Sequence, residues 1–286
     1  MENPDDKYLW KTDKEEFFPK LTVYELAMGF LRFLIFISFT LCSIPLFLLA
    51  KLFFNQTGIK KPMVTIRRYW SLITLRLCSL KIKVKGTFSS DVCLVVCNHI
   101  SWLDILAIQS IADVVFVAKY DVKNWPGLGF LAKLANTLFV ERNPQKIGLH
   151  SQQANVILSN GNSICFFPEG TSSDGLRVLK FRSGFFQLAF NNTLGKKVNA
   201  INIQPLSIFY EPKNCNMSID FYGWWGNMSL FLHILKVLCK SSGIISLNFH
   251  TLLKSDSFLD RKQLASKAED IIRAELRLNI EKNRIR

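Results

Sequence analysis

The chain has 286 residues, of which 49% are hydrophobic, and it carries 36 Lys and Arg residues against 22 Asp and Glu residues. This apolar share excludes a disordered chain, and the length is sufficient for a sizeable core. The net charge of +14 indicates an anionic partner, which is nucleic acid, a phosphorylated substrate or an acidic membrane surface. Residues 1–31 contain four Lys and seven acidic residues, so residues 32–286 carry a net charge of +17. Basic charge together with high hydrophobicity favours a lipid surface over DNA.

The strongest apolar segment, residues 33–50, follows an acidic N-terminal tail that we assign to residues 1–26. Its 18 residues contain no charge, and as a helix they would span about 27 Å, close to the ~30 Å hydrocarbon thickness of a bilayer. Pro45 is expected to kink this helix, so both a full crossing and a re-entrant path remain open. We assign residues 27–80 to a membrane anchor with interfacial helices.

Basic residues are concentrated on the C-terminal side of the apolar segment. Because cytoplasmic flanks of membrane segments are enriched in Lys and Arg, the rest of the chain is expected on the cytoplasmic face of a membrane. A bacterial inner membrane is the location that we predict. The basic residues on this flank are Lys51, Lys60, Lys61, Arg67, Arg68 and Arg76.

Apolar strand patterns alternate with helical patterns from residue 81 to the end of the chain, without an internal repeat or a linker. Such alternation predicts a single α/β domain over residues 81–286, with a mixed sheet and covering helices. The expected strands are residues 81–88, 92–97, 114–118, 137–140, 163–167, 201–210, 218–222 and 244–250. The expected helices are residues 62–79, 102–111, 127–134, 145–158, 184–190, 228–239 and 261–278.

The cysteines and histidines do not form a metal-binding or disulfide pattern. The seven Cys residues include no Cys-x-x-Cys pair and lie mostly in apolar runs, as reduced core thiols do. With four His residues, no zinc cluster can be assembled from neighbouring positions. We therefore expect no metal.

His99 and Asp104 form the first candidate catalytic pair. They follow the apolar strand at residues 92–97, within the sequence NHISWLD. A carboxylate beside a histidine fixes the imidazole tautomer and stabilises its protonated form, which suits general-base catalysis. In a straight helix the two residues would lie about 140° apart, so the turn between strand and helix must bring them together. A histidine that only caps a helix is the structural alternative.

Two further motifs end strands in the same region. FPEGT, at residues 167–171, combines Glu169, the conformational freedom of Gly170 and the hydroxyl of Thr171. FVERN, at residues 139–143, offers Arg142, whose planar guanidinium is suited to phosphate. Taken alone, the first motif is also compatible with an ordinary turn and the second with a surface ion pair.

Together these motifs resemble the glycerolipid acyltransferase family typified by lysophosphatidic acid acyltransferase. The resemblance includes NHISWLD, FVERN, FPEGT, the stretch WPGLGFLAK at residues 125–133 and QPL at residues 204–206, and it covers residues 80–210 well. It implies a glycerol-phosphate acyltransferase-like fold in which a membrane-embedded segment precedes the catalytic domain. It also implies transfer of a fatty acyl group to 1-acylglycerol-3-phosphate, giving phosphatidic acid in phospholipid biosynthesis.

The resemblance assigns a role to each candidate residue. His99 would deprotonate the acceptor hydroxyl while Asp104 holds His99, and no covalent acyl-enzyme is implied. Glu169, Gly170 and Thr171 would position the acceptor, and Arg142 would help to bind its headgroup. The enzyme would use no cofactor, since an acyl thioester of acyl carrier protein or coenzyme A is a co-substrate. Its partners would be membrane lipids and the lysophospholipid, not nucleic acid.

The sequence departs from the family at position 172, where enzymes with phosphate-bearing acceptors usually have Arg and this chain has Ser172. Either Arg177, Lys180 or Arg182 fills that place, or the acceptor has a different headgroup. The continuation SSDG and the later stretch WWGNM resemble a bacterial subgroup that includes lyso-ornithine lipid acyltransferases, so ornithine lipid synthesis is the alternative function. A basic nucleic-acid-binding protein and a non-catalytic membrane scaffold are remote alternatives.

Overall fold

The fold is built around a central mixed sheet. The structure is a computed structural model that describes residue 10 and residues 19–141, 143, 146–190, 201–213, 217–240 and 242–284. In these residues, seven strands form one sheet in the order β1-β7-β6-β2-β5-β3-β4, and every neighbouring pair is parallel except β6 and β7. The strands are β1 (Leu80–Lys85), β2 (Cys93–Cys97), β3 (Val114–Lys119), β4 (Leu138–Val140), β5 (Ser163–Phe166), β6 (Asn202–Pro212) and β7 (Gly243–Phe249).

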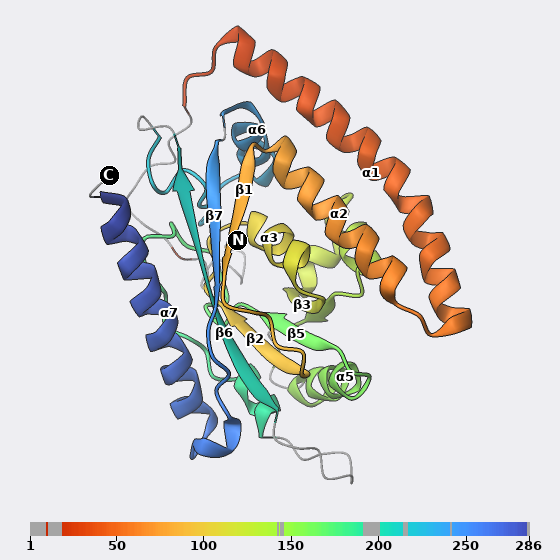
Figure 1. Cartoon of the computed structure of the whole chain (residues 1–286), viewed down its shortest axis with the longest axis vertical. Helices are drawn as coiled ribbons and strands as arrows, with labels where there is room; N and C mark the ends of the chain where they lie inside the picture. The colour runs from red at the N-terminus through yellow and green to blue at the C-terminus, as the bar shows by residue number, and fades with distance from the viewer. Residues whose placement is uncertain are drawn as a thin grey trace.

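Helices cover both faces of this sheet, as Figure 1 shows. The predicted α/β fold with a mixed sheet is therefore confirmed. The α-helices are α1 (Val23–Thr57), α2 (Lys61–Leu77), α3 (Leu103–Ile111), α4 (Leu128–Leu134), α5 (Ile147–Ser159), α6 (Leu230–Lys240) and α7 (Arg261–Arg284). The short 3-10 helices are η2 (Tyr120–Asn124), η4 (Phe185–Ala189) and η5 (Ser255–Ser257).

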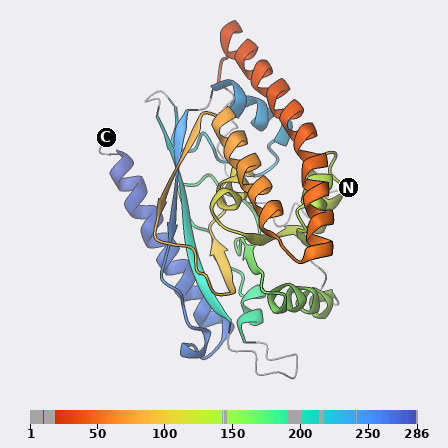
Figure 2. The same ribbon diagram turned by 45° about the vertical axis from the view of Figure 1, so that its right-hand side comes forward.

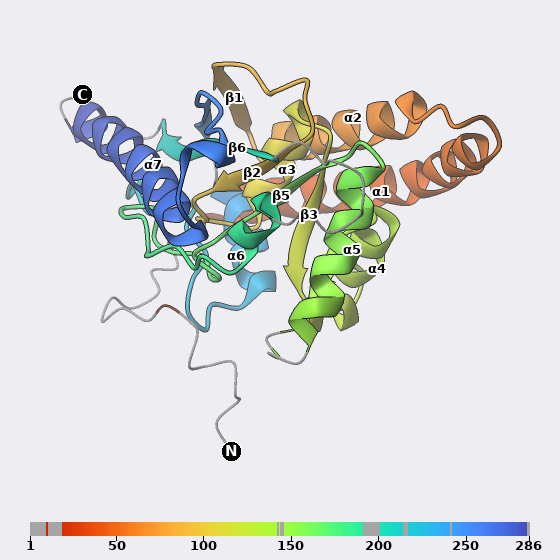
Figure 3. The same ribbon diagram turned by 90° about the horizontal axis from the view of Figure 1, so that it is seen from below.

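The core is divided into two layers by the sheet. One hydrophobic cluster joins α2, α3 and α6 to the sheet, and the other joins α5, η4 and α7 to the opposite face. Figure 2 shows the sheet between α7 on one side and the α1–α2 pair on the other, and Figure 3 shows the same separation from below. Because β2 is central, all five of its side chains are buried, which explains its uninterrupted apolar sequence.

Helix α1 contains the predicted apolar segment and extends beyond it on both sides. Thr22 and Glu25 form a capping box at its start, and Gly58, with φ of 71°, ends it. Its 35 residues correspond to about 50 Å of helix, and it is a candidate membrane span with a mean hydropathy of 2.5 in its most apolar window. The helix continues through Pro45.

Side chains on α1 contact the domain near both ends and in the middle of the helix. Phe36 packs against Trp70 of α2, and the Nζ of Lys51 donates a 3.3 Å hydrogen bond to Asn136. The helix therefore lies along the domain and does not project from it, as Figure 1 shows. Many apolar side chains on its other sides remain exposed: Phe30, Leu31, Leu34, Ile35, Ile37, Leu41, Leu46, Leu48, Leu49, Leu52 and Phe53.

The first turns of α1 pack closely against α6. A Cβ atom built on Gly29 would lie 2.2 Å from the Sγ of Cys239, so only glycine permits this approach. Arg32 donates a 2.8 Å hydrogen bond to the carbonyl of Leu238, and Glu25 lies 3.4 Å from the ammonium of Lys240. These contacts join the candidate membrane helix to a helix of the α/β domain.

Two predicted elements differ from the structure. Residues 218–222 form turns instead of a strand, because the amide of Phe221 bonds back to the carbonyl of Ser218 at 3.0 Å. The pattern of residues 184–190 predicts an α-helix, but the structure has the 3-10 helix η4 there. Phe221 and Tyr222 are nonetheless buried, which explains why their sequence resembles a strand.

Candidate active site

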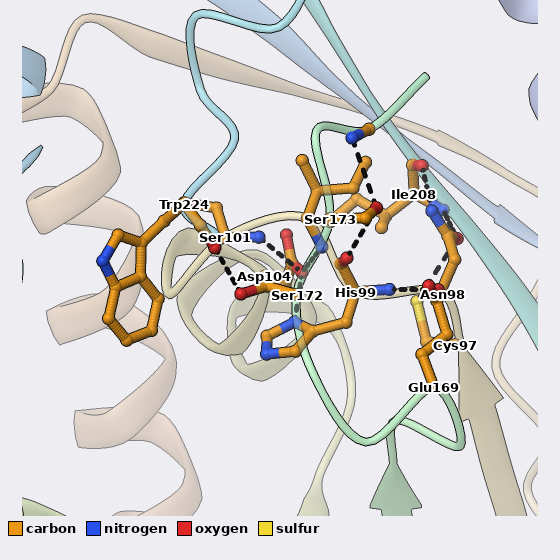
Figure 4. Close-up of polar contacts among 12 residues, drawn as sticks. Cys97, Asn98, His99, Ser101, Asp104, Glu169, Ser172, Ser173, Ile208 and Trp224 are labelled. Atoms are coloured by element: carbon orange, nitrogen blue, oxygen red, sulfur yellow. Dashed lines mark hydrogen bonds and ion pairs between the residues drawn. The ribbon is translucent and has the colours of Figure 1, made fainter. Parts of the chain in front are cut away.

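His99 and Asp104 meet at the carboxyl end of β2, as the turn between strand and helix was predicted to arrange. His99 lies in the loop after β2, and Asp104 is in the first turn of α3. The Nδ1 of His99 is 2.8 Å from the Oδ2 of Asp104, and Figure 4 shows the imidazole directed at the carboxylate. Asp104 is completely buried, whereas 18% of the His99 side chain is exposed.

The carboxylate of Asp104 is surrounded by hydrogen-bond donors. The amides of Ile100 and Ser101 donate to Oδ2 at 2.8 and 3.0 Å. The phenol of Tyr210 donates to Oδ1 at 2.6 Å. Donors of this kind offset the cost of burying an anion, so Asp104 is held as a carboxylate.

The tautomer of His99 follows from this arrangement. Because the carboxylate of Asp104 only accepts, the Nδ1 of His99 carries the proton and donates it. Nε2 is then the basic nitrogen, and within the described part of the chain no group bonds to it. The imidazole also stacks on Phe167, with ring centroids 4.1 Å apart and an interplanar angle of 18°. Two different contacts therefore fix the orientation of the ring.

Glu169 of the FPEGT motif holds the backbone of His99. One carboxylate oxygen accepts from the amide of His99 at 2.9 Å, and the other accepts from the amide of Leu179 at 3.0 Å. The side chain is 3% exposed, and burial raises the pKa of Glu169 to about 8. The structure therefore brings His99, Asp104 and Glu169 together. The side chain of Glu169 is hydrogen-bonded to two backbone amides of the protein.

Gly170 and Arg182 lie side by side at the edge of this site. Gly170 has φ of 73°, and a Cβ atom there would lie 3.2 Å from the guanidinium carbon of Arg182. The amide of Arg182 also donates to the carbonyl of Pro168 at 2.9 Å. Arg182 is exposed, and the neighbouring Thr171 is partly buried. Arg182 therefore contacts the FPEGT loop through both its side chain and its backbone.

The other predicted cations lie in different environments. Arg177 forms a 3.2 Å ion pair with Asp174, and its guanidinium lies 5.3 Å from the ring centre of Trp10. Lys180 is exposed. Arg142 lies outside the described residues.

Ser172 occupies the position at which the resemblance leads us to expect Arg. Its hydroxyl is directed into the protein and donates to the carbonyl of Trp224, as Figure 4 shows. The amide of Trp224 in turn donates to the carbonyl of Ile100 at 2.9 Å. The WWGNM stretch is therefore packed against the loop that carries His99, and Ser172 is part of that contact.

Sequence reasoning did not identify Tyr210 as part of the site. In the sequence it is one more apolar residue of an expected strand. The register of the sheet provides the missing signal: β2 and β6 are parallel with Cys97 opposite Leu206, so residues shortly after Leu206 extend beside the loop that begins at residue 98. This register depends on contacts over 100 residues apart in the sequence, which periodicity does not reveal.

Other reactive groups near the site are not arranged for catalysis. Ser101 is fully buried, and its hydroxyl has no hydrogen-bond partner among the residues that the structure describes, so it does not present a nucleophile to substrate. The thiols of Cys97 and Cys165 are buried, and this burial raises the pKa of both. No group of three His, Cys, Asp or Glu side chains suited to a metal ion occurs among the described residues.

A buried carboxylate, an oriented imidazole and a ring nitrogen that no described group binds are the parts that a general base requires, and they lie at the end of a parallel strand. The Acyltransferase family model matches residues 81–209 of this chain. A lyso-ornithine lipid O-acyltransferase of Rhodobacter capsulatus is 32% identical over 225 residues, 76% of this chain and 80% of that protein. A 1-acyl-sn-glycerol-3-phosphate acyltransferase of Neisseria gonorrhoeae is 30% identical over 182 residues, 63% of this chain and 68% of that protein.

A solved structure shares the fold. The crystal structure of the 1-acyl-sn-glycerophosphate acyltransferase PlsC from Thermotoga maritima superposes with a TM-score of 0.63 at 19% identity, covering 88% of this chain and 96% of that one. The chain belongs to the Acyltransferase family and is an O-acyltransferase of the lysophospholipid type. The expected family is thus confirmed.

Proposed function

We propose that this protein transfers a fatty acyl group from an acyl thioester to the hydroxyl of 1-acylglycerol-3-phosphate, forming phosphatidic acid. The observation that carries the proposal is the 2.8 Å contact between His99 and Asp104, which leaves Nε2 of His99 as the base. Nε2 removes the proton of the acceptor hydroxyl as its oxygen attacks the thioester carbonyl carbon. The C–S bond then breaks, and the leaving thiolate takes the proton from His99 to give the free thiol.

The acceptor headgroup is anionic in this proposal, and we assign its binding to Arg182, an exposed residue whose guanidinium lies beside Gly170. A planar guanidinium donates two parallel hydrogen bonds to a phosphate, which gives both charge and direction. The likeness to the Neisseria enzyme and to the expected family motifs supports this acceptor.

A lyso-ornithine lipid is the second candidate acceptor. Position 172 carries a neutral Ser, so it provides no cation for a phosphate. The hydroxyl of Ser172 is directed at the carbonyl of Trp224 instead. The Rhodobacter relative, which carries the lyso-ornithine name, aligns with more of this chain than the Neisseria relative does. The two acceptors are therefore compared directly.

The experiment is an acyl-transfer assay with purified full-length protein in detergent. Both acceptors are offered with acyl carrier protein and coenzyme A thioesters as donors, which also identifies the donor. We expect transfer to 1-acylglycerol-3-phosphate and a loss of about 10²–10⁴-fold in His99→Ala, because a positioned base contributes a factor of this size. Ser101→Ala, a buried neighbour of the base, is the control that retains activity.

Two outcomes would contradict the proposal. Transfer to the ornithine lipid alone would replace the proposed acceptor by the second candidate. Near-normal turnover by a folded His99→Ala protein would exclude His99 as the base.

We also place the protein at the cytoplasmic face of a bacterial inner membrane. The exposed apolar side chains of α1 and the basic residues that follow it support this location. Some of these cations bind the domain, since Arg67 pairs with Asp113 and Arg68 donates to the carbonyl of Ile111 at 2.6 Å. A long acyl chain also resides in the bilayer, because each buried CH₂ contributes about 0.8 kcal/mol.

A further inference from the structure

Tyr210 contributes a hydrogen bond to the catalytic carboxylate that no other described residue supplies. Three of the four donors around Asp104 bind Oδ2: the His99 imidazole and the amides of Ile100 and Ser101. The fourth donor, the Tyr210 phenol, binds Oδ1 at 2.6 Å. Asp104 is 0% exposed and Tyr210 is 2% exposed, so water does not replace this bond.

We propose that Tyr210 is a positioning residue for acyl transfer. Its phenol fixes the rotation of the Asp104 carboxylate and moderates its charge, and it thereby sets the orientation and basicity of His99. This inference rests on the proposed function, in which His99 is the base.

The orientation effect follows from the geometry of a carboxylate. The torsion that turns a carboxylate about its Cβ–Cγ bond has a broad energy minimum. Donors on Oδ2 alone would hold one oxygen while the other remained free to move. With Tyr210 on Oδ1, both oxygens of Asp104 are fixed, and the direction of the bond to the His99 ring is fixed with them.

The charge effect has a defined sign. The phenol of Tyr210 withdraws negative charge from the carboxylate, which weakens its attraction for a proton on His99. Without the phenol, protonated His99 persists to higher pH, and the basic form is reached only there. Burial, together with the neighbouring Asp104, raises the pKa of Tyr210 well above its ordinary value, so the phenol keeps its proton.

The other titratable groups around Asp104 do not supply this effect. Cys97 on β2 and Cys165 on β5 are buried thiols whose pKa is raised, and both stay neutral. Glu169, whose pKa burial raises to about 8, binds the His99 backbone and is retained in every variant used below. Tyr222 stacks on Tyr210 with ring centroids 5.3 Å apart and provides a matched control phenol.

The test compares Tyr210→Phe with Tyr222→Phe in the full-length protein. We expect Tyr210→Phe to lower kcat about tenfold, the effect of leaving a buried acceptor unpaired, with little change in KM. The acid limb of its pH–kcat profile should also move to higher pH. Tyr222→Phe should change neither. A ring-fluorinated tyrosine at position 210, whose phenol is a stronger donor, should move the acid limb in the opposite direction.

A second measurement does not depend on turnover. NMR titration of isotope-labelled histidine follows the imidazole of His99 directly, and Tyr210→Phe should shift this titration to higher pH. The positioning role would be overturned if the two Phe variants gave the same kcat and the same His99 titration. If the wild-type protein transferred no acyl group while the titration still shifted, the proposed function would fail and the coupling through Asp104 would stand.

Discussion

Single residues join the loops that follow β2 and β5 into one unit. The amide of His99 donates to Glu169, and the carbonyl of His99 accepts from the amide of Ser173 at 3.0 Å. Both backbone groups of His99 are thus held by the segment that begins with the FPEGT motif. The FPEGT motif therefore fixes the backbone of His99, the residue that we propose as the base.

Glu169 should make the stability of the protein dependent on pH. Its folded-state pKa of about 8 lies above the ordinary value of 4.5, so the folded protein binds this proton more tightly than the unfolded chain. Stability on this account is highest below pH 4.5 and falls as the pH rises toward 8. The Tm of the wild type should therefore fall more steeply over this pH range than the Tm of Glu169→Gln. Parallel curves would contradict the assignment.

His233 is a second buried polar residue that sequence reasoning passed over. It accepts from the indole of Trp102 at 3.0 Å and contacts the carbonyl of Gly223 at 2.9 Å, and burial lowers its pKa to about 3. Its sequence position on an amphipathic helix predicts only burial. Gly223 is only ten residues away, but Trp102 is 131 residues away in the chain, so the pairing with Trp102 depends on a tertiary contact.

The sequence predicts the helices and strands better than it predicts the contacts between them. Apolar runs located β2, β5 and β6 because buried strands of a mostly parallel sheet need apolar side chains on both faces. The same reasoning failed at residues 218–222, where burial of Phe221 and Tyr222 is achieved by turns. Hydrophobicity predicts which side chains are buried, but it does not determine the backbone that buries them.

The contact between α1 and α6 should be sensitive to a single methyl group. Gly29→Ala places a Cβ atom 2.2 Å from the Sγ of Cys239, so the helices must separate. We expect a loss of about 1–3 kcal/mol, measured as a lower Tm, because overpacking costs this much. Gly148→Ala in α5, where the new Cβ atom meets nothing within 4 Å, should be neutral or stabilising.

A double variant identifies the origin of the effect. Cys239→Ala removes the Sγ atom, so it should restore part of the stability lost in Gly29→Ala. Equal stability of Gly29→Ala and Gly148→Ala would show that the helices do not approach as described.

On the scale of the whole molecule, thiol labelling tests how the protein lies in a membrane. Cys42 on α1 is exposed, and the other described cysteines are buried. In spheroplasts, a charged, impermeant maleimide should leave Cys42 unlabelled because lipid covers it. A Leu259→Cys variant, at a position that is 92% exposed, should react only after the inner membrane is permeabilised.

The labelling uses a Cys215→Ser background, since Cys215 lies outside the described residues. Labelling of Cys42 in intact spheroplasts would contradict burial of α1 in lipid. Labelling of Leu259→Cys before permeabilisation would place the domain on the other face.

The packing of α1 on α6 joins two segments that are synthesised at very different times. Arg32 and its partner Leu238 are 206 residues apart, so α1 leaves the ribosome long before its docking surface on α6 exists. Until then α1 can pack on α2, through contacts such as that of Phe36 with Trp70, and a bilayer is a surface that can cover its remaining apolar side chains. We therefore expect α6 to dock on a helix that is already in place, since closing so long a loop carries a large entropic cost.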